Sequence, residues 1–183
     1  MKNVLVPLAQ GCEEIEAVTI IDLLRRADIN VVSAGLDDKP VTASRGTVLV
    51  PDTTLDDALK QDFDMIVLPG GLPGANHLRD DPRIQNKLKQ MAADNKYTAA
   101  ICAAPIALAS AGVLKNKKAT CFPGSMDNSP TDTTTFMDEP VVVDDKVVTS
   151  KGPGTAMVFA LTLIEELEGS AARDAVEAPL QRI

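Results

Sequence analysis

Short apolar strands alternate with helical segments along most of this chain, and this alternation limits the possible folds more than any other feature of the sequence. Residues 4–8 (VLVPL) have the composition of a buried strand. After Glu13, apolar side chains recur at steps of three, which indicates one face of a helix. Repeated units of this kind predict an α/β fold with a mostly parallel sheet and helices on both of its faces.

The same pattern predicts the remaining elements. Two short strands joined around Arg45 are expected as an antiparallel excursion within residues 41–50, and Thr54 is expected to cap a short helix. The polar stretch 124–139 is too short to link two domains, so residues 1–183 are expected to form one domain with a surface loop there. We expect further strands at residues 30–34, 65–68, 98–101, 118–121 and 146–150, and helices at 55–60, 83–95, 105–111 and 155–167.

Composition and charge exclude several classes of protein. The 183 residues include 45% apolar and 24% charged residues, as in globular proteins, and the net charge of -8 disfavours nucleic acid and anionic membranes as partners. Three cysteines without CxxC spacing predict neither a disulfide framework nor a zinc site, which favours a reducing compartment such as the cytoplasm. No leader, membrane-spanning segment, metal or cofactor is expected.

Cys102 is the strongest candidate for a reactive group. It lies in the turn between the predicted strand 98–101 and an alanine-rich helix that has Pro105 in its first turn. At such a position the positive end of the helix and free backbone N–H groups stabilise a thiolate, which predicts a lowered thiol pKa. A buried structural cysteine is the alternative interpretation.

A glycine-rich segment, PGGLPG at residues 69–74, follows the predicted strand 65–68. Ligand sites of parallel sheets lie beyond the carboxyl ends of the strands, so this segment and Cys102 are expected at the same edge. Gly70 and Gly71 would let backbone N–H groups approach a bound oxygen and form an oxyanion hole facing the thiol. A simple turn is the main alternative, and a phosphate-binding loop is disfavoured because GxGxxG spacing and a Walker lysine are lacking.

Three glutamates, Glu13, Glu14 and Glu16, begin the first predicted helix, where acidic side chains complement the helix dipole. Glu16 lies on a different helical face from Glu14, so one of them can turn inward while the other stays in water. An ionised Glu16 beside Cys102 would raise the pKa of the thiol. Partial burial would raise the pKa of Glu16 itself, and the protonated carboxyl would then serve as general acid and base.

The other candidate groups are weaker. His77 is the only histidine and precedes Cys102, so a cysteine–histidine pair in the usual downstream order is impossible. Cys12 borders the first helix and Cys121 ends a predicted strand, and both are expected to have packing or redox roles.

Five motifs occur in order along the chain, namely GCEEIEAVTIIDLLRRA at 11–27, ASRG at 43–46, IVLPGG at 66–71, AAICAAP at 99–105 and TSKGPGTA at 149–156. Together they resemble the ThiJ/PfpI superfamily, and within it the clade of DJ-one-type protein deglycases and glutathione-independent glyoxalases. The resemblance spans nearly the whole chain. It implies a flavodoxin-like three-layer sandwich, a nucleophile elbow and a homodimer.

The resemblance also implies roles for particular residues. Cys102 matches the nucleophile of the superfamily, and Glu16 matches its protonated carboxyl partner. Gly71 and Ala103 match the residues that supply backbone N–H donors. Three more residues match positions near the subunit contact and the mouth of the active site, namely Glu13, Arg26 and Arg45.

Two departures narrow the possible activities. Ala103 stands where protease-like members carry a histidine. Glutamine amidotransferases need a histidine and a glutamate far downstream of the cysteine. This chain therefore lacks the base that each of these two branches uses. Phe122 stands where animal members have a histidine, so a mechanism that uses that histidine as proton carrier does not transfer to this chain.

The leading hypothesis is a glyoxalase and deglycase, in which the Cys102 thiolate adds to methylglyoxal, glyoxal or an early glycated protein adduct while Glu16 moves the proton. A non-enzymatic alternative uses the same residues, because an accessible low-pKa thiol is readily oxidised. In that case the protein would be an oxidative-stress sensor or a redox-regulated chaperone.

Overall fold

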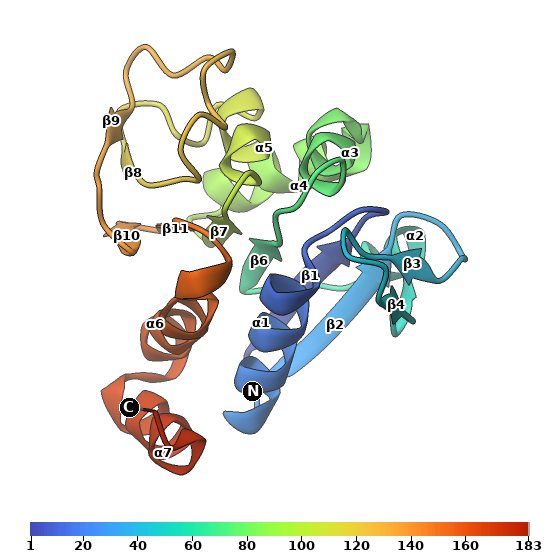
Figure 1. Ribbon diagram of the computed structural model, residues 1–183, viewed down its shortest axis with the longest axis vertical. Helices are drawn as coiled ribbons and strands as arrows, with labels where there is room; N and C mark the ends of the chain where they lie inside the picture. Colours follow the sequence, from blue (N-terminus) through green and yellow to red (C-terminus); the bar gives the residue numbers. More distant parts are fainter. Residues whose placement is uncertain (183) are drawn as a thin grey trace.

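The computed structural model describes residues 1–182 and has a central seven-stranded sheet with helices on both faces (Figure 1). The strand order is β10-β11-β7-β6-β1-β2-β5, and all neighbours are parallel except β10 and β11. The predicted α/β sandwich is therefore confirmed. Its strands are β1 (Asn3–Leu8), β2 (Asn30–Gly35), β5 (Thr53–Thr54), β6 (Met65–Leu68), β7 (Tyr97–Ile101), β10 (Val141–Asp144) and β11 (Val147–Ser150).

The helices divide into two groups that cover opposite faces of the sheet. α1 (Glu14–Arg26) and α6 (Ala156–Glu168) pack against each other, and α7 (Ser170–Glu177) packs on α6 (Figure 1). Their buried side chains belong to one apolar cluster, whereas the other face has a second cluster. That second cluster is built from α2 (Leu55–Ala58), α3 (Gly74–Asp80), α4 (Pro82–Ala93) and α5 (Pro105–Ser110).

Several elements differ from the sequence-based expectation. The segment expected as a strand at 118–121 shortens to β8 (Lys118–Ala119), which leaves the central sheet and pairs with β9 (Thr135–Phe136). α3 was not expected, because its glycine- and proline-rich start lacks a helical signal. The antiparallel excursion is confirmed as β3 (Val41–Thr42) and β4 (Val48–Leu49). Within residues 1–182, no helix has both the length and the apolar character needed to cross a bilayer.

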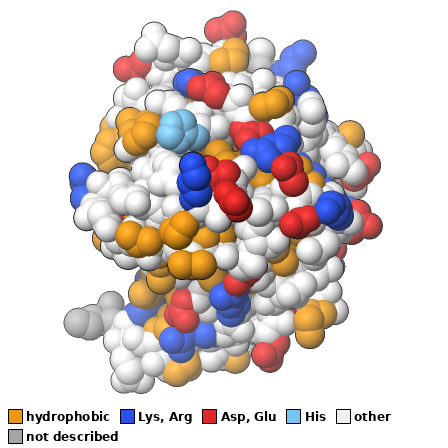
Figure 2. Space-filling view, turned by 90° about the vertical axis from the view of Figure 1, so that its right-hand side faces the viewer, with side chains coloured by type: hydrophobic (Ala, Val, Ile, Leu, Met, Phe, Trp, Pro, Cys, Tyr) orange, Lys and Arg blue, Asp and Glu red, His pale blue; other side chains and the backbone are white. Residues whose placement is uncertain are grey.

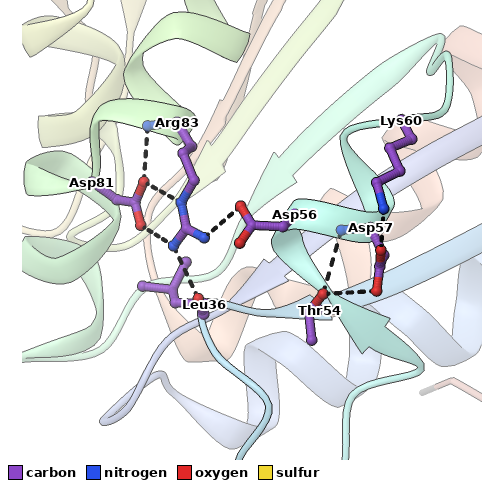
Figure 3. Close-up of polar contacts among 7 residues, drawn as sticks. All are labelled: Leu36, Thr54, Asp56, Asp57, Lys60, Asp81 and Arg83. Atoms are coloured by element: carbon purple, nitrogen blue, oxygen red, sulfur yellow. Dashed lines mark hydrogen bonds and ion pairs between the residues drawn. The ribbon is translucent and has the colours of Figure 1, made fainter.

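The capping predicted for the short helix α2 is confirmed, since Thr54 Oγ1 accepts a hydrogen bond of 3.3 Å from Asp57 N–H (Figure 3). α2 is also tied to α4 through Arg83. The guanidinium of Arg83 contacts the carboxylates of Asp56 at 2.8 Å and Asp81 at 2.6 Å, and it donates to the carbonyl of Leu36 at 2.9 Å (Figure 3). One side chain thus joins α2, the start of α4 and the end of β2.

Charges of both signs are interspersed on the face of the molecule seen in Figure 2, and the apolar side chains there form separate small patches. Most ion pairs between such surface charges are exposed to solvent, and exposed ion pairs contribute little to stability. The Arg83–Asp81 pair is different, because the Asp81 side chain is only 11% exposed and Arg83 also donates to a backbone carbonyl. We expect this pair to contribute to folding.

Replacing Arg83 by Met should lower the free energy of unfolding by about 1–2 kcal/mol, because the Asp81 carboxylate and the Leu36 carbonyl lose a charged donor. Arg173→Met is the matched control, since Arg173 pairs with Glu177 within one helix near the surface and should cost less than about 0.5 kcal/mol. The measurement is urea unfolding of both variants and the wild type. Equal midpoints for the two variants would contradict the special role of Arg83.

Candidate active site

Three loops meet at the carboxyl ends of neighbouring parallel strands. The loop after β1 leads into α1 and Glu16, the loop after β6 contains Gly70 and Gly71, and the turn after β7 contains Cys102. These strands are adjacent in the sheet, so their loops adjoin, as the sequence predicted. A cavity of about 540 Å³ opens above them. Its lining consists of Glu13, Ser44, Arg45, Gly71, Leu72, Cys102, Ala103, Phe122, Pro123, Gly124, Ser125 and Pro153.

Cys102 forms a sharp turn between β7 and α5. Its φ of 63° lies in the left-handed region, which costs a residue other than glycine about 1–2 kcal/mol. Two backbone hydrogen bonds hold the turn, since Cys102 N–H donates to Ser150 at 2.9 Å and its carbonyl accepts from Phe122 N–H at 2.8 Å. The residue is 8% exposed and reaches the cavity floor. Such a strained turn is typical of functional sites.

Gly70 fits between the thiol and the carboxyl because it has no side chain. A Cβ at this position would lie 2.7 Å from Cys102 Cβ and 2.8 Å from Glu16 Oε2. Its N–H donates to Glu16 Oε2 at 2.8 Å. This corrects the expectation that Gly70 belongs to the oxyanion hole, because its N–H is already bound to Glu16.

Gly71 and Ala103 present their backbone N–H groups to the sulfur of Cys102. Gly71 has a φ of +84°, and a Cβ there would collide with the backbone of Cys12 and Glu13, so only glycine fits. Both residues line the cavity. Their N–H groups can therefore donate to an anion on or next to the sulfur.

Glu16 is fully buried and points at this turn from the first helical turn of α1. Burial raises the pKa of its carboxyl to about 7, the N–H of Gly70 and the Cys102 thiol lower it, and the nearby Glu13 raises it. Oε2 accepts from Gly70, whereas Oε1 accepts no hydrogen bond from residues 1–182. A buried carboxylate oxygen without a donor disfavours the charged form of Glu16, in agreement with the raised pKa.

The pKa of the Cys102 thiol is raised to about 12, first by burial and then by the charge and hydrogen bond of Glu16. The N–H groups of Gly71 and Ala103 act in the opposite direction. The expectation of a lowered thiol pKa is therefore wrong, because burial of the thiol and the carboxyl of Glu16 outweigh the two backbone N–H groups. When Glu16 holds the proton, its charge no longer opposes the thiolate.

The three glutamates have separate roles, and the separation of Glu16 from Glu14 is the one that their helical positions predicted. Glu13 caps α1, and its Oε2 accepts from Glu16 N–H at 2.9 Å. Glu14 points outward and accepts from Ser44 Oγ and from the N–H of Arg45. Although burial opposes the change, the backbone N–H groups around Glu14 lower the pKa of its carboxyl to about 2. Glu14 is thus an anion that anchors the β3–β4 excursion, and Glu16 is the inward acid.

The remaining candidates are placed in different regions. Glu13 and Arg45 line the cavity, but Arg26 lies in the last turn of α1 and pairs with Asp22 at 2.8 Å, away from the cavity. His77 lies on α3, where its ring contacts the carbonyl of Gln10 at 3.2 Å.

The lining residues that sequence reasoning missed are Ser44, Leu72, Pro123, Gly124, Ser125 and Pro153. The motifs ASRG and TSKGPGTA contain two of them, Ser44 and Pro153, so these motifs carried a signal for the site. Cys12 and Cys121 are not part of the lining.

Several known proteins are similar to this chain in both sequence and fold. The chain is 43% identical over 182 residues to the Parkinson disease protein 7 homolog of Danio rerio, which covers 98% of this chain and 96% of the relative. It is 37% identical over 171 residues to the glutathione-independent glyoxalase DJR-1.2 of Caenorhabditis elegans, covering 93% and 91%. A solved structure titled Toxoplasma gondii DJ-1, oxidized, superposes with a TM-score of 0.92 at 41% identity and 98% coverage of both chains.

Some relatives are much longer. The chain spans 46% and 41% of the length of proteins DJ-1 homolog A and homolog B of Arabidopsis thaliana, to each of which it is 41% identical. The model of the DJ-1/PfpI family matches residues 2–166, which include all three loops of the candidate site. From this match and the similarity to full-length relatives, the chain belongs to the DJ-1/PfpI family.

Proposed function

We propose that this protein is a glutathione-independent glyoxalase that also acts as a deglycase on early glycated adducts. The main support is that four groups lie together at one cavity. They are the Cys102 thiol, the buried carboxyl of Glu16 with its pKa near neutrality, and the backbone N–H groups of Gly71 and Ala103. A relative named as a glyoxalase supports the proposal. The substrate class is a 2-oxoaldehyde such as methylglyoxal or glyoxal.

The reaction begins when the Cys102 thiolate attacks the aldehyde carbon. A C–S bond forms, and the carbonyl electron pair moves onto oxygen, where the N–H groups of Gly71 and Ala103 stabilise the charge. Glu16 donates its proton to this oxygen. The carboxylate that remains then removes the hydrogen of the former aldehyde carbon and returns it to the neighbouring carbon through an enediol.

This proton shift oxidises the aldehyde carbon to a thioester and reduces the ketone carbon to an alcohol. Water then cleaves the C–S bond of the thioester and releases the 2-hydroxy acid, which is lactate from methylglyoxal and glycolate from glyoxal. The net change is addition of one water to the oxoaldehyde, so no external oxidant or reductant is needed. An adduct of methylglyoxal with a protein thiol or amine enters by the same attack after the aldehyde is released.

We also propose a homodimer that uses the outer face of α1. Ile15 and Val18 lie three residues apart on that helix and are 56% and 48% exposed, although both are large and apolar. The same helix begins at the cavity with Glu13 and ends with Arg26. A contact along α1 would place Arg26 at the dimer interface and leave the cavity next to the partner.

We also propose that the protein is cytoplasmic, because its three free cysteines fit a reducing compartment.

A redox sensor or redox-regulated chaperone is the second candidate, and one observation favours it. The Toxoplasma gondii relative has a solved structure that is described as oxidized. In this chain, the N–H groups beside Cys102 and a protonated Glu16 would also stabilise a sulfinate on the sulfur. The two functions differ in the fate of the thiol. A glyoxalase regenerates the Cys102 thiol after each turnover, whereas a sensor keeps it oxidised.

Replacing Cys102 by Ala should reduce lactate formation from methylglyoxal at least about 10³-fold, because the covalent step loses its nucleophile. Replacing Glu16 by Gln should reduce it about 10²–10⁴-fold, because the proton carrier is lost. The assay measures lactate without glutathione. Cys121→Ala is the matched control and should stay within about twofold, since Cys121 lies outside the cavity lining.

Undiminished turnover by Cys102→Ala would rule out the covalent mechanism. Absence of turnover by the wild type, together with rapid addition of two oxygens to Cys102 in peroxide, would favour the sensor instead. Mass spectrometry of the peroxide-treated protein provides that second reading.

The raised pKa of Glu16 should make the folded protein less stable as the pH rises. The folded state holds the proton up to a pKa of about 7, whereas the unfolded chain loses it near 4.5, so stability falls between these two values. Glu16→Gln removes this dependence and should be more stable than the wild type at pH 8 by up to about 3 kcal/mol, and equally stable at pH 4. Urea unfolding at both pH values measures the difference.

Glu14→Gln provides the control with the opposite sign. The pKa of Glu14 is lowered, so its ionised form stabilises the folded protein, and removing it should decrease stability at pH 8. Parallel behaviour of the two variants at pH 8 would contradict the assignment of Glu16 as a buried acid near neutrality.

The proposed dimer predicts a mass in solution of about twice the 19.4 kDa of the chain by light scattering. Val18→Asp should yield the monomer, because a charge in an apolar contact is left without a partner. Val143→Asp is the control, since Val143 is 42% exposed on β10, far along the sheet from α1, and should leave the mass unchanged. A wild-type monomer would contradict the proposal.

A further inference from the structure

The cavity above Cys102 is larger than a three-carbon oxoaldehyde needs. Its volume is about 540 Å³, within the range of about 300–1,000 Å³ in which proteins bind drug-sized ligands. Two large apolar side chains of its lining are exposed, Leu72 at 61% and Phe122 at 49%. Exposed apolar surface inside a cavity favours a ligand that covers it. The size and the lining together call for a substrate with an apolar substituent.

Phe122 is held in a fixed position relative to the nucleophile. Its N–H donates to the carbonyl of Cys102 at 2.8 Å, and its own carbonyl accepts from Ser125 N–H at 3.0 Å. One edge of the ring lies against Gly152, where an added Cβ would be 3.4 Å from Phe122 Cδ2. Backbone hydrogen bonds and packing on Gly152 therefore hold Phe122 in the lining of the cavity that also contains Cys102.

The charges around the cavity do not select a charged substituent. Glu13 supplies a carboxyl and Arg45 a guanidinium, and these are the charged side chains of the lining besides the thiol itself. Because the lining carries one acidic and one basic side chain, it has no excess of either charge that would select a charged substituent. The lining near Phe122 adds Pro123 and Gly124, which carry no charge.

We infer that Phe122 is a specificity-determining residue that selects 2-oxoaldehydes with an aromatic or branched apolar substituent over methylglyoxal. The inference rests on the proposed function and names the substrate class of the same site. The thiol attacks the aldehyde carbon as in the smaller substrate, and the ketone substituent lies against the Phe122 ring. Contact between two aromatic rings, with removal of both from water, favours this arrangement.

The test compares phenylglyoxal with methylglyoxal in the wild type, Phe122→Ala and Phe122→Leu. Mandelate and lactate are measured as initial rates, so any modification of arginine by phenylglyoxal does not enter the signal. The phenyl group also changes the intrinsic reactivity of the carbonyl. For that reason the decisive quantity is the change between variants in the ratio of kcat/KM for the two substrates.

Phe122→Ala should lower the ratio of kcat/KM for phenylglyoxal to that for methylglyoxal roughly tenfold. The loss should appear as a higher KM for phenylglyoxal and should exceed any change in kcat/KM for methylglyoxal. Phe122→Leu, which keeps apolar surface, should retain most of the ratio. A ring with only a structural role would instead change both substrates alike.

Each other outcome overturns the inference in a distinct way. An unchanged ratio in Phe122→Ala, or an equal loss for both substrates, removes Phe122 as a specificity residue. Lactate without mandelate from the wild type means that the site excludes large substituents, and the proposed glyoxalase function then stands without this inference. Neither product from the wild type removes the proposed function and the inference with it.

Discussion

The close approach of Glu16, Gly70 and Cys102 is the contact on which the rest of the site depends. These residues come from three loops, but β1, β6 and β7 are neighbouring parallel strands, so their carboxyl ends adjoin. No side chain fits at position 70, since a Cβ there would lie within 2.8 Å of the carboxyl and closer still to Cys102. The absence of that side chain lets one buried acid and one thiol at the edge of the cavity lie close together.

The central strands could be predicted because burial on both faces imposes a continuous apolar sequence. β1 and β6 are buried along almost their whole length, and both were predicted within one residue of their ends. β5 and β10 lie at the two edges of the sheet, where pairing rather than composition defines a strand, and both were missed. β8 was assigned to the wrong sheet because its partner β9 lies in a polar loop without a strand pattern.

The site was predictable in its residue types and less so in its energetics. Position after a strand identified Cys102 and the glycine-rich loop, and helical periodicity separated Glu16 from Glu14. The raised pKa of Cys102 depends on how completely neighbouring segments bury the thiol, which no local pattern contains. Two hydrogen bonds of the site likewise join segments that are separated in the sequence. Gly70 N–H donates to Glu16, and Phe122 N–H donates to the carbonyl of Cys102.

A carboxyl partner also has an electrostatic consequence that a histidine partner would not have. A histidine that takes the thiol proton becomes a cation, so the buried pair would separate two charges. A glutamate that takes it becomes neutral, so the pair carries one negative charge whichever group holds the proton. The backbone donors match both states, since Gly70 N–H faces the carboxyl while Gly71 and Ala103 N–H face the sulfur. In the proposed mechanism, proton transfer would therefore move one negative charge between two groups that each have backbone donors. The proposed proton carrier would lie beside the proposed nucleophile even though the only histidine of the chain lies on α3.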